Sequence, residues 1–153
     1  MYKRQDKSYY KQDTEKSSDV DETDRISGKH ILLAEDNDLN AEIAETVLVE
    51  AGIEVKRVED GLQCIEELKK MPENYYDVIL MDVQMPNMDG YTATQRIRDL
   101  DDSRAEIPII AMTANAYDED RRKAQEAGMD GFLAKPLDVD EMMRLLGKIT
   151  KTE

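Results

Sequence analysis

The segment that decides the fold is residues 76–90, YDVILMDVQMPNMDG. Up to Met81 it is an apolar run, which predicts a buried strand. Asp82 follows this run directly, and Pro86 and Gly90 then indicate a loop before the next segment. In sheets built from parallel strands, functional groups gather beyond the carboxyl ends of the strands. The segment therefore predicts a functional carboxylate at the edge of such a sheet.

Short apolar runs alternate with helix-like segments on both sides of this segment. Strands are expected at residues 30–34, 53–58, 76–81, 107–111 and 131–134. Helices are expected at about residues 38–51, 62–71, 90–100, 117–127 and 138–149. Strands that alternate with helices predict βαβ units with right-handed crossovers. We therefore expect an α/β fold with one five-stranded parallel sheet and helices on both of its faces.

Residues 1–28 differ in composition from the rest of the chain. They are rich in charged residues and contain almost no aliphatic side chains apart from Val20 and Ile26. Such a segment cannot bury enough apolar surface to order itself. We expect residues 1–28 to be a disordered charged tail or linker, and residues 29–150 to form one domain.

Charge and hydropathy exclude several kinds of partner. The formal net charge is −14, whereas direct contact with nucleic acid needs clustered Lys and Arg. No apolar run approaches the roughly 20 residues of a membrane-spanning helix. Cys64 is the single cysteine, so no internal disulfide is possible. The chain is expected to be cytoplasmic, with no contact to membranes and none directly to nucleic acid.

Polar side chains stand at the ends of four predicted strands: Glu35 and Asp36, then Asp82, Thr113 and Lys135. Three carboxylates at one sheet edge repel one another unless a cation intervenes. Mg²⁺ fits, because it needs few protein oxygens and takes phosphate oxygens as further ligands. A carboxylate beside Mg²⁺ and a lysine is a competent nucleophile toward phosphorus. Asp82 is expected to form an acyl phosphate.

Four motifs at these strand ends resemble the receiver domains of bacterial two-component response regulators. They are ILLAEDN at 31–37, MDVQMPNMDG at 81–90, IIAMTA at 109–114 and FLAKP at 132–136. The resemblance covers about residues 29–148 and implies the (βα)5 flavodoxin-like receiver fold. Within the family, the sequences of the motifs are most similar to those of receivers attached to hybrid sensor histidine kinases.

The resemblance implies a phosphoacceptor switch. Asp82 would accept a phosphoryl group from a phosphohistidine of a histidine kinase or a histidine phosphotransfer domain. Glu35, Asp36, Asp82 and the backbone carbonyl of Gln84 would bind Mg²⁺. The side chain of Gln84 would tune the lifetime of the phosphoryl group.

Further roles follow from the same resemblance. Thr113, Ala114 and Lys135 would contact the phosphoryl group. Thr113 and Phe132 would form the conformational switch, with Phe132 at the family's aromatic position. Asn115 would tune the phosphoryl lifetime, and the peptide bond before Pro136 would be cis.

Two alternatives from other functional classes remain. A phosphatase resembling the haloacid dehalogenases would use Asp82 as nucleophile, but it needs a second Asp where this chain has Gln84. A pseudo-receiver that only binds partners is disfavoured by the complete set of site residues. We expect no enzyme beyond a domain that catalyses its own phosphorylation and dephosphorylation. Oligomeric state, output and membership of a hybrid kinase stay open.

Overall fold

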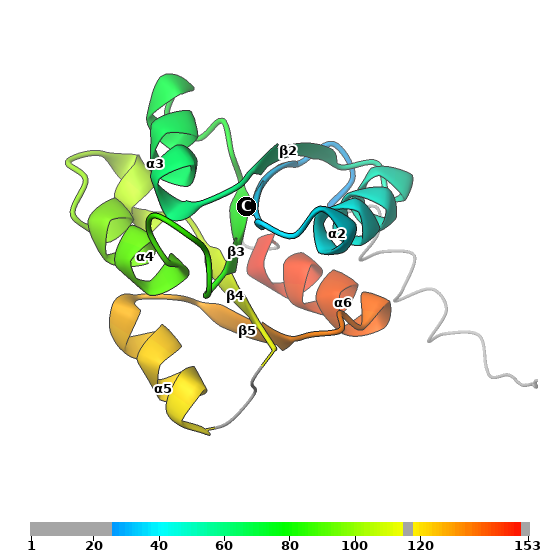
Figure 1. Ribbon diagram of the computed structural model, residues 1–153. Helices are drawn as coiled ribbons and strands as arrows, with labels where there is room; N and C mark the ends of the chain where they lie inside the picture. Colours follow the sequence, from blue (N-terminus) through cyan, green and yellow to red (C-terminus); the bar gives the residue numbers. More distant parts are fainter. Residues whose placement is uncertain (1–25, 115–117, 151–153) are drawn as a thin grey trace, which may run out of the picture.

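The computed structural model describes residues 26–114 and 118–150 (Figure 1). One parallel sheet joins its five strands in the order β2-β1-β3-β4-β5. The strands are β1 (His30–Ala34), β2 (Glu54–Val58), β3 (Val78–Asp82), β4 (Ile109–Thr113) and β5 (Gly131–Ala134). The helices are α2 (Asp38–Glu50), α3 (Gly61–Lys70), α4 (Gly90–Arg98), α5 (Asp118–Ala127) and α6 (Val139–Thr150), with a 3₁₀ helix η1 (Ser103–Glu106). The expected five-stranded α/β fold is confirmed.

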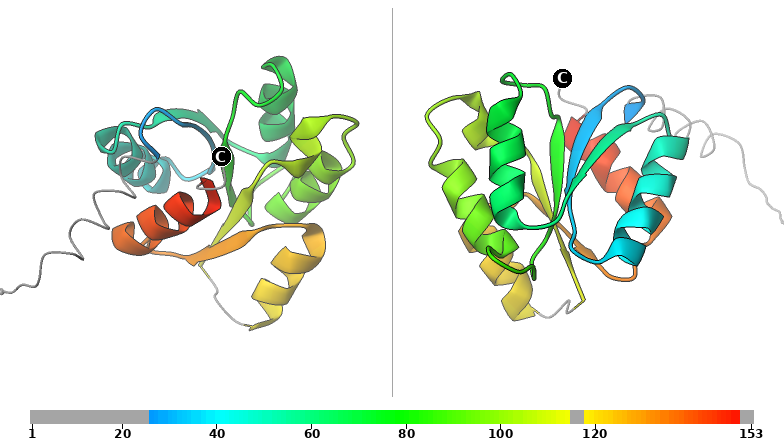
Figure 2. Two further views of the ribbon diagram at one scale, coloured as in Figure 1. Left: turned by 180° about the vertical axis from the view of Figure 1, so that it is seen from behind. Right: turned by 45° about the horizontal axis from the view of Figure 1, so that its top comes forward.

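Two helical layers cover the sheet. Helices α2 and α6 lie on one face, and α3, α4 and α5 lie on the other (Figures 1 and 2). Successive side chains of a strand point to opposite faces, so Leu32 belongs to the core under α3 and α4 while Leu33 belongs to the core under α2 and α6. This two-sided burial explains the continuous apolar runs. No helix in residues 26–114 and 118–150 is long and apolar enough to cross a membrane.

Strands β3 and β4 both begin two residues later than expected. Pro108 lies just before β4, where its missing N–H removes no ladder hydrogen bond, and its carbonyl accepts from Ile79 N at 2.9 Å. Both strands also end later than expected, so Asp82 and Thr113 are the last residues of their strands and not loop residues. Asp82 pairs with Met112 across the sheet. The side chains of Asp82 and Thr113 are therefore attached to backbone that belongs to the sheet.

The packed region begins before the boundary expected at Lys29. Ile26 is only 1% exposed and packs into the core between the sheet and α2. Gly28 N donates to Gly52 O at 2.8 Å, and Lys29 N donates to Ile26 O at 3.1 Å. These contacts bring residues 26–28 into the domain. The remainder of the expected tail, residues 1–25, lies outside the described residues.

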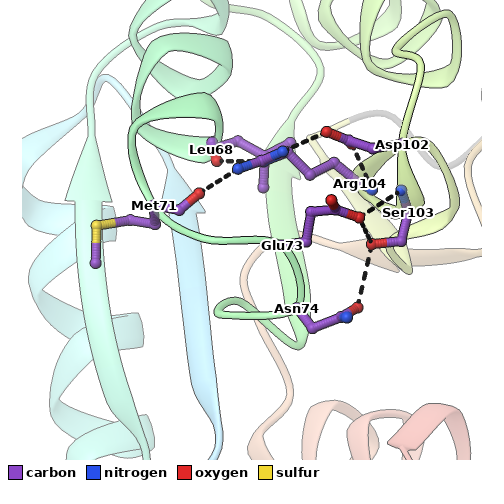
Figure 3. Close-up of polar contacts among 7 residues, drawn as sticks. All are labelled: Leu68, Met71, Glu73, Asn74, Asp102, Ser103 and Arg104. Atoms are coloured by element: carbon purple, nitrogen blue, oxygen red, sulfur yellow. Dashed lines mark hydrogen bonds and ion pairs between the residues drawn. The ribbon is translucent and has the colours of Figure 1, made fainter.

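Arg104 ties the connection between α4 and β4 to the end of α3 (Figure 3). Its guanidinium donates to Leu68 O at 3.0 Å and to Met71 O, and forms an ion pair with Asp102. The side chain is only 15% exposed. The carbonyls at the end of a helix have no intrahelical partner, so Arg104 satisfies groups that would otherwise be buried unpaired. Neither η1 nor this role of Arg104 was expected from the sequence.

Replacing Arg104 tests how much this link stabilises the fold. Arg104→Met keeps much of the side chain's length but leaves two carbonyls without their donor and Asp102 without its ion pair. We expect it to lower the free energy of unfolding in urea by about 2–3 kcal/mol. Arg122→Met is the control, because Arg122 is exposed and its pair with Glu126, at 3.9 Å, should contribute less than about 0.5 kcal/mol. Equal losses in both variants would contradict the assignment.

Candidate functional site

The polar residues expected at the strand ends converge at one edge of the sheet. Glu35 follows β1, Asp82 ends β3, Thr113 ends β4 and Lys135 follows β5. The strands are parallel and adjacent, so their carboxyl ends face the same side (Figure 1). Lys135 N donates to Thr113 O at 2.7 Å, which continues the pairing of β4 with β5 to the site.

Three carboxylates form the centre of the site. Oxygen atoms of Glu35, Asp36 and Asp82 all lie within 4.8 Å of one another. Glu35 and Asp82 are buried, at 2% and 5% exposed, whereas Asp36 is open to solvent. Carboxylate oxygens are hard ligands of the kind that Mg²⁺ prefers. The donor set therefore fits a divalent cation that enters from the solvent side.

Lys135 connects the two buried acids. Its Nζ lies 2.8 Å from Glu35 Oε1 and 3.1 Å from Asp82 Oδ2. The peptide bond between Lys135 and Pro136 is cis, as the resemblance to receiver domains implied. A single ammonium group thus faces two carboxylates, and the cluster of four side chains retains a net negative charge.

The electrostatics of Asp82 follow from this arrangement. Burial and the neighbouring Glu35 raise the pKa of Asp82 to about 6, although the Gln84 N–H and Lys135 oppose the shift. Burial would lower the pKa of Lys135, but its contacts with Glu35 and Asp82 outweigh burial and raise that pKa. The lysine stays charged while Asp82 is an unusually basic carboxylate. A carboxyl group whose pKa is perturbed this strongly by burial and a charged neighbour is a candidate functional residue.

Phe132 and Thr113 lie on the strands beside the acids. Thr113 is buried, and Phe132 on β5 is partly exposed. The guanidinium carbon of Arg121, on α5, lies 4.8 Å from the centroid of the Phe132 ring, a cation–π distance. Ala114 follows Thr113 and is exposed, and Asn115 lies outside the described residues.

Sequence reasoning missed an arginine that shapes the site. Arg57 on β2 donates to Glu35 O from Nε at 2.9 Å and from Nη2 at 2.7 Å, and pairs with Asp38 at 3.0 Å. It fixes the backbone that carries Glu35 and Asp36. A single Arg at the end of a short amphipathic strand carries no motif, so only the register of β1 and β2 reveals it.

A second missed pair joins the loop after Asp82 to the start of α3. Asn87 Nδ2 donates to Asp60 Oδ2 at 2.7 Å, and Asp60 is only 4% exposed. The sequence separation of 27 residues hides this contact from local patterns.

Comparisons with known proteins agree with this geometry. The family model of the response regulator receiver domain matches residues 31–147. The chain is 40% identical over 125 residues to the peroxide stress-activated histidine kinase mak1 of Schizosaccharomyces pombe, covering 80% of this chain and 8% of that protein. It is 39% identical over 116 residues to the sensor histidine kinase RcsC of Escherichia coli K12, covering 76% of this chain and 12% of that protein. The chain thus spans a small part of both kinases.

A solved structure gives the same result. The receiver domain of sensor histidine kinase PA1611 from Pseudomonas aeruginosa PAO1, which has a magnesium ion coordinated in its active site cleft, is 40% identical with a TM-score of 0.74. The match covers 82% of this chain and 99% of that one. The chain therefore belongs to the response regulator receiver domain family, the phosphoacceptor switches of two-component phosphorelays.

Proposed function

We propose that Asp82 is the phosphoacceptor of this switch. The observation that carries the proposal is the position of the Asp82 carboxylate, buried at the end of β3 and 3.1 Å from Lys135 Nζ, among three clustered acids. Glu35 is buried under the same lysine, and Asp36 is exposed. Asp82 is the acid that combines burial, a cation and a raised pKa of about 6.

The transfer step uses groups of this chain for positioning. A carboxylate oxygen of Asp82 attacks the phosphorus of a phosphohistidine, the P–N bond breaks, and its electron pair returns to the imidazole nitrogen. Lys135 Nζ, the Thr113 hydroxyl and the Ala114 backbone N–H donate to the oxygens of the transferred group. Catalysis of phosphoryl transfer consists mainly of such positioning and charge neutralisation, so the chain needs no general acid.

The cofactor is Mg²⁺, held by Glu35, Asp36, Asp82 and the backbone carbonyl of Gln84. The oxygen donors within 4.8 Å support this assignment, as does the magnesium bound by the PA1611 receiver. When bound, the ion neutralises the charge of the acids and of the incoming phosphoryl oxygens. Gln84 N donates to Asp82 Oδ1 at 3.2 Å, and the side chain of Gln84 is exposed. We propose that this side chain tunes the access of water to the acyl phosphate.

The phosphoryl group is read out through Thr113 and Phe132. Thr113 moves toward the phosphoryl oxygens, and Phe132 moves inward into the space that this leaves. Arg121 covers the outer face of the Phe132 ring before the change. Asn115 is proposed to tune the phosphoryl lifetime together with Gln84.

The donor is a histidine kinase or a histidine phosphotransfer domain. The matched regions cover only 8% and 12% of the lengths of two sensor kinases. We therefore propose that this chain is the receiver of a hybrid kinase and that the kinase activity lies outside it. Residues 1–25 then belong to a linker, and residues 26–150 to the receiver. We propose a cytoplasmic location.

Phosphorylation with a small-molecule donor tests the central proposal. With acetyl phosphate and Mg²⁺, intact-mass analysis should show the gain of one phosphoryl group, which EDTA prevents. Asp82→Asn should abolish the gain because it removes the nucleophile. Asp89→Asn, an exposed change that keeps a helix-capping side chain, should leave it intact.

Two results would contradict the assignment. One is a phosphoryl group that persists in Asp82→Asn. The other is sustained Mg²⁺-dependent hydrolysis of a generic phosphate ester by the wild type, which would favour the phosphatase alternative.

The switch role of Phe132 can be read from a single signal, because Phe132 is the only phenylalanine of the chain. Biosynthetic 4-fluorophenylalanine therefore gives one ¹⁹F resonance. Acetyl phosphate with Mg²⁺ should shift this resonance, since the ring leaves its contact with Arg121, and Asp82→Asn should remove the effect. A resonance unmoved in fully phosphorylated wild type would refute the switch role.

A further inference from the structure

The loop between β3 and α4, residues 83–89, is held at its base and at its tip. At the base, Gly90 N donates to Val83 O at 3.1 Å. At the tip, Gly61 N donates to Met88 O at 3.0 Å, and Asn87 Nδ2 donates to Asp60 Oδ2 at 2.7 Å. Both contacts at the tip join the loop to the start of α3. The segment between the two attachments contains Gln84.

The carboxylate of Asp60 accepts two hydrogen bonds and forms no ion pair in the described part of the chain. Its Oδ1 accepts from Gln63 N at 2.8 Å, which caps α3. Its Oδ2 accepts from Asn87. A carboxylate that is 4% exposed is costly unless its oxygens are hydrogen-bonded, so the Asn87 bond is favoured by the burial of Asp60.

Asn87 adopts a backbone conformation that needs support. Its φ is 65°, in the left-handed region that most non-glycine residues avoid at a cost of about 1 kcal/mol or more. Asn tolerates this region better than other side chains. The neighbouring contact is close as well, since a Cβ on Gly61 would lie 2.7 Å from Met88 O. The hydrogen bond to Asp60 thus holds Asn87 in its strained backbone conformation and fixes the tip of the loop.

We propose that Asp60 and Asn87 are positioning residues for the divalent cation. Only Met85 and Pro86 separate Gln84 from Asn87, and a proline fixes its own φ and restricts the backbone of the residue before it, here Met85. Fixing Asn87 therefore restricts where the Gln84 carbonyl points, while Gln84 N is bonded to Asp82 Oδ1. This inference rests on the proposed Mg²⁺ site. It adds that a pair outside the ligand set, the buried Asp60 and the exposed Asn87, determines the affinity of that site for the ion.

The test measures Mg²⁺ affinity without any phosphoryl donor, by titration of the ¹⁵N–¹H amide signals of Asp82 and Gln84. Asn87→Gly keeps the left-handed backbone accessible and removes only the side-chain bond. We expect Mg²⁺ to bind about tenfold more weakly, the usual effect of losing an outer partner of a metal ligand. Asn74→Gly is the matched control, because Asn74 has φ 67° in a loop at the opposite end of the sheet. It should bind Mg²⁺ like the wild type.

An exchange of side chains separates positioning from charge. Asn87→Asp alone sets two carboxylates against each other and should weaken Mg²⁺ binding, whereas a purely electrostatic effect of the added charge would strengthen it. Combining Asp60→Asn with Asn87→Asp restores one donor and one acceptor at unchanged net charge. The combination should recover most of the wild-type affinity.

The outcomes distinguish this inference from the proposed function. If the wild type binds Mg²⁺ and Asn87→Gly binds it equally well, the positioning role is overturned. Tighter binding by Asn87→Asp, or no recovery in the exchange variant when its amide spectrum is native, would also overturn it. If the wild type shows no Mg²⁺ binding at all, the proposed metal site fails and this inference fails with it.

Discussion

The site depends on one contact, in which the ammonium group of Lys135 lies between the buried carboxylates of Glu35 and Asp82. One positive charge cannot neutralise two buried acids and a third exposed one. The remaining negative charge is what a divalent cation is proposed to neutralise, so that an anionic phosphoryl group can approach Asp82. The raised pKa of Asp82, caused by burial and by Glu35, expresses the same imbalance. This cluster of charges by itself destabilises the folded chain, and the proposed function depends on it.

The rest of the fold serves to hold these charges in place. Each of the central strands is buried on both faces, so the acids at the strand ends cannot move without disturbing two cores. Arg57 fixes the backbone after β1, and the pair of Asp60 and Asn87 fixes the loop after β3. At the opposite end of the sheet, Arg104 satisfies the last carbonyls of α3 and closes the connection into β4. Side-chain hydrogen bonds therefore fix the backbone at both ends of the sheet.

The fold and the clustering of the site could be predicted from the sequence because both follow local patterns. Apolar runs that each end in a polar residue gave the strand ends, and the parallel sheet then brought Glu35, Asp82 and Lys135 together. The contacts of Arg57, Arg104 and Asn87 were not predicted. They join segments 22 to 36 residues apart through single side chains, and nothing in the local sequence marks such partners. The start of the domain at Ile26 was not predicted either, because one aliphatic residue among charged residues shows no periodicity.

Thermal and urea unfolding of the wild type and Asp82→Asn, in EDTA and in Mg²⁺, is the most direct test of this account. Because folding raises the pKa of Asp82 from 3.8 to about 6, the folded state binds the proton more tightly, and ionisation weakens the fold as the pH rises through this window. In EDTA at neutral pH, Asp82→Asn should therefore be more stable than the wild type, by on the order of 2 kcal/mol, with the difference shrinking toward pH 4. Mg²⁺ should stabilise the wild type more than the variant. A variant that is no more stable than the wild type in EDTA, or an equal response of both to Mg²⁺, would contradict the account.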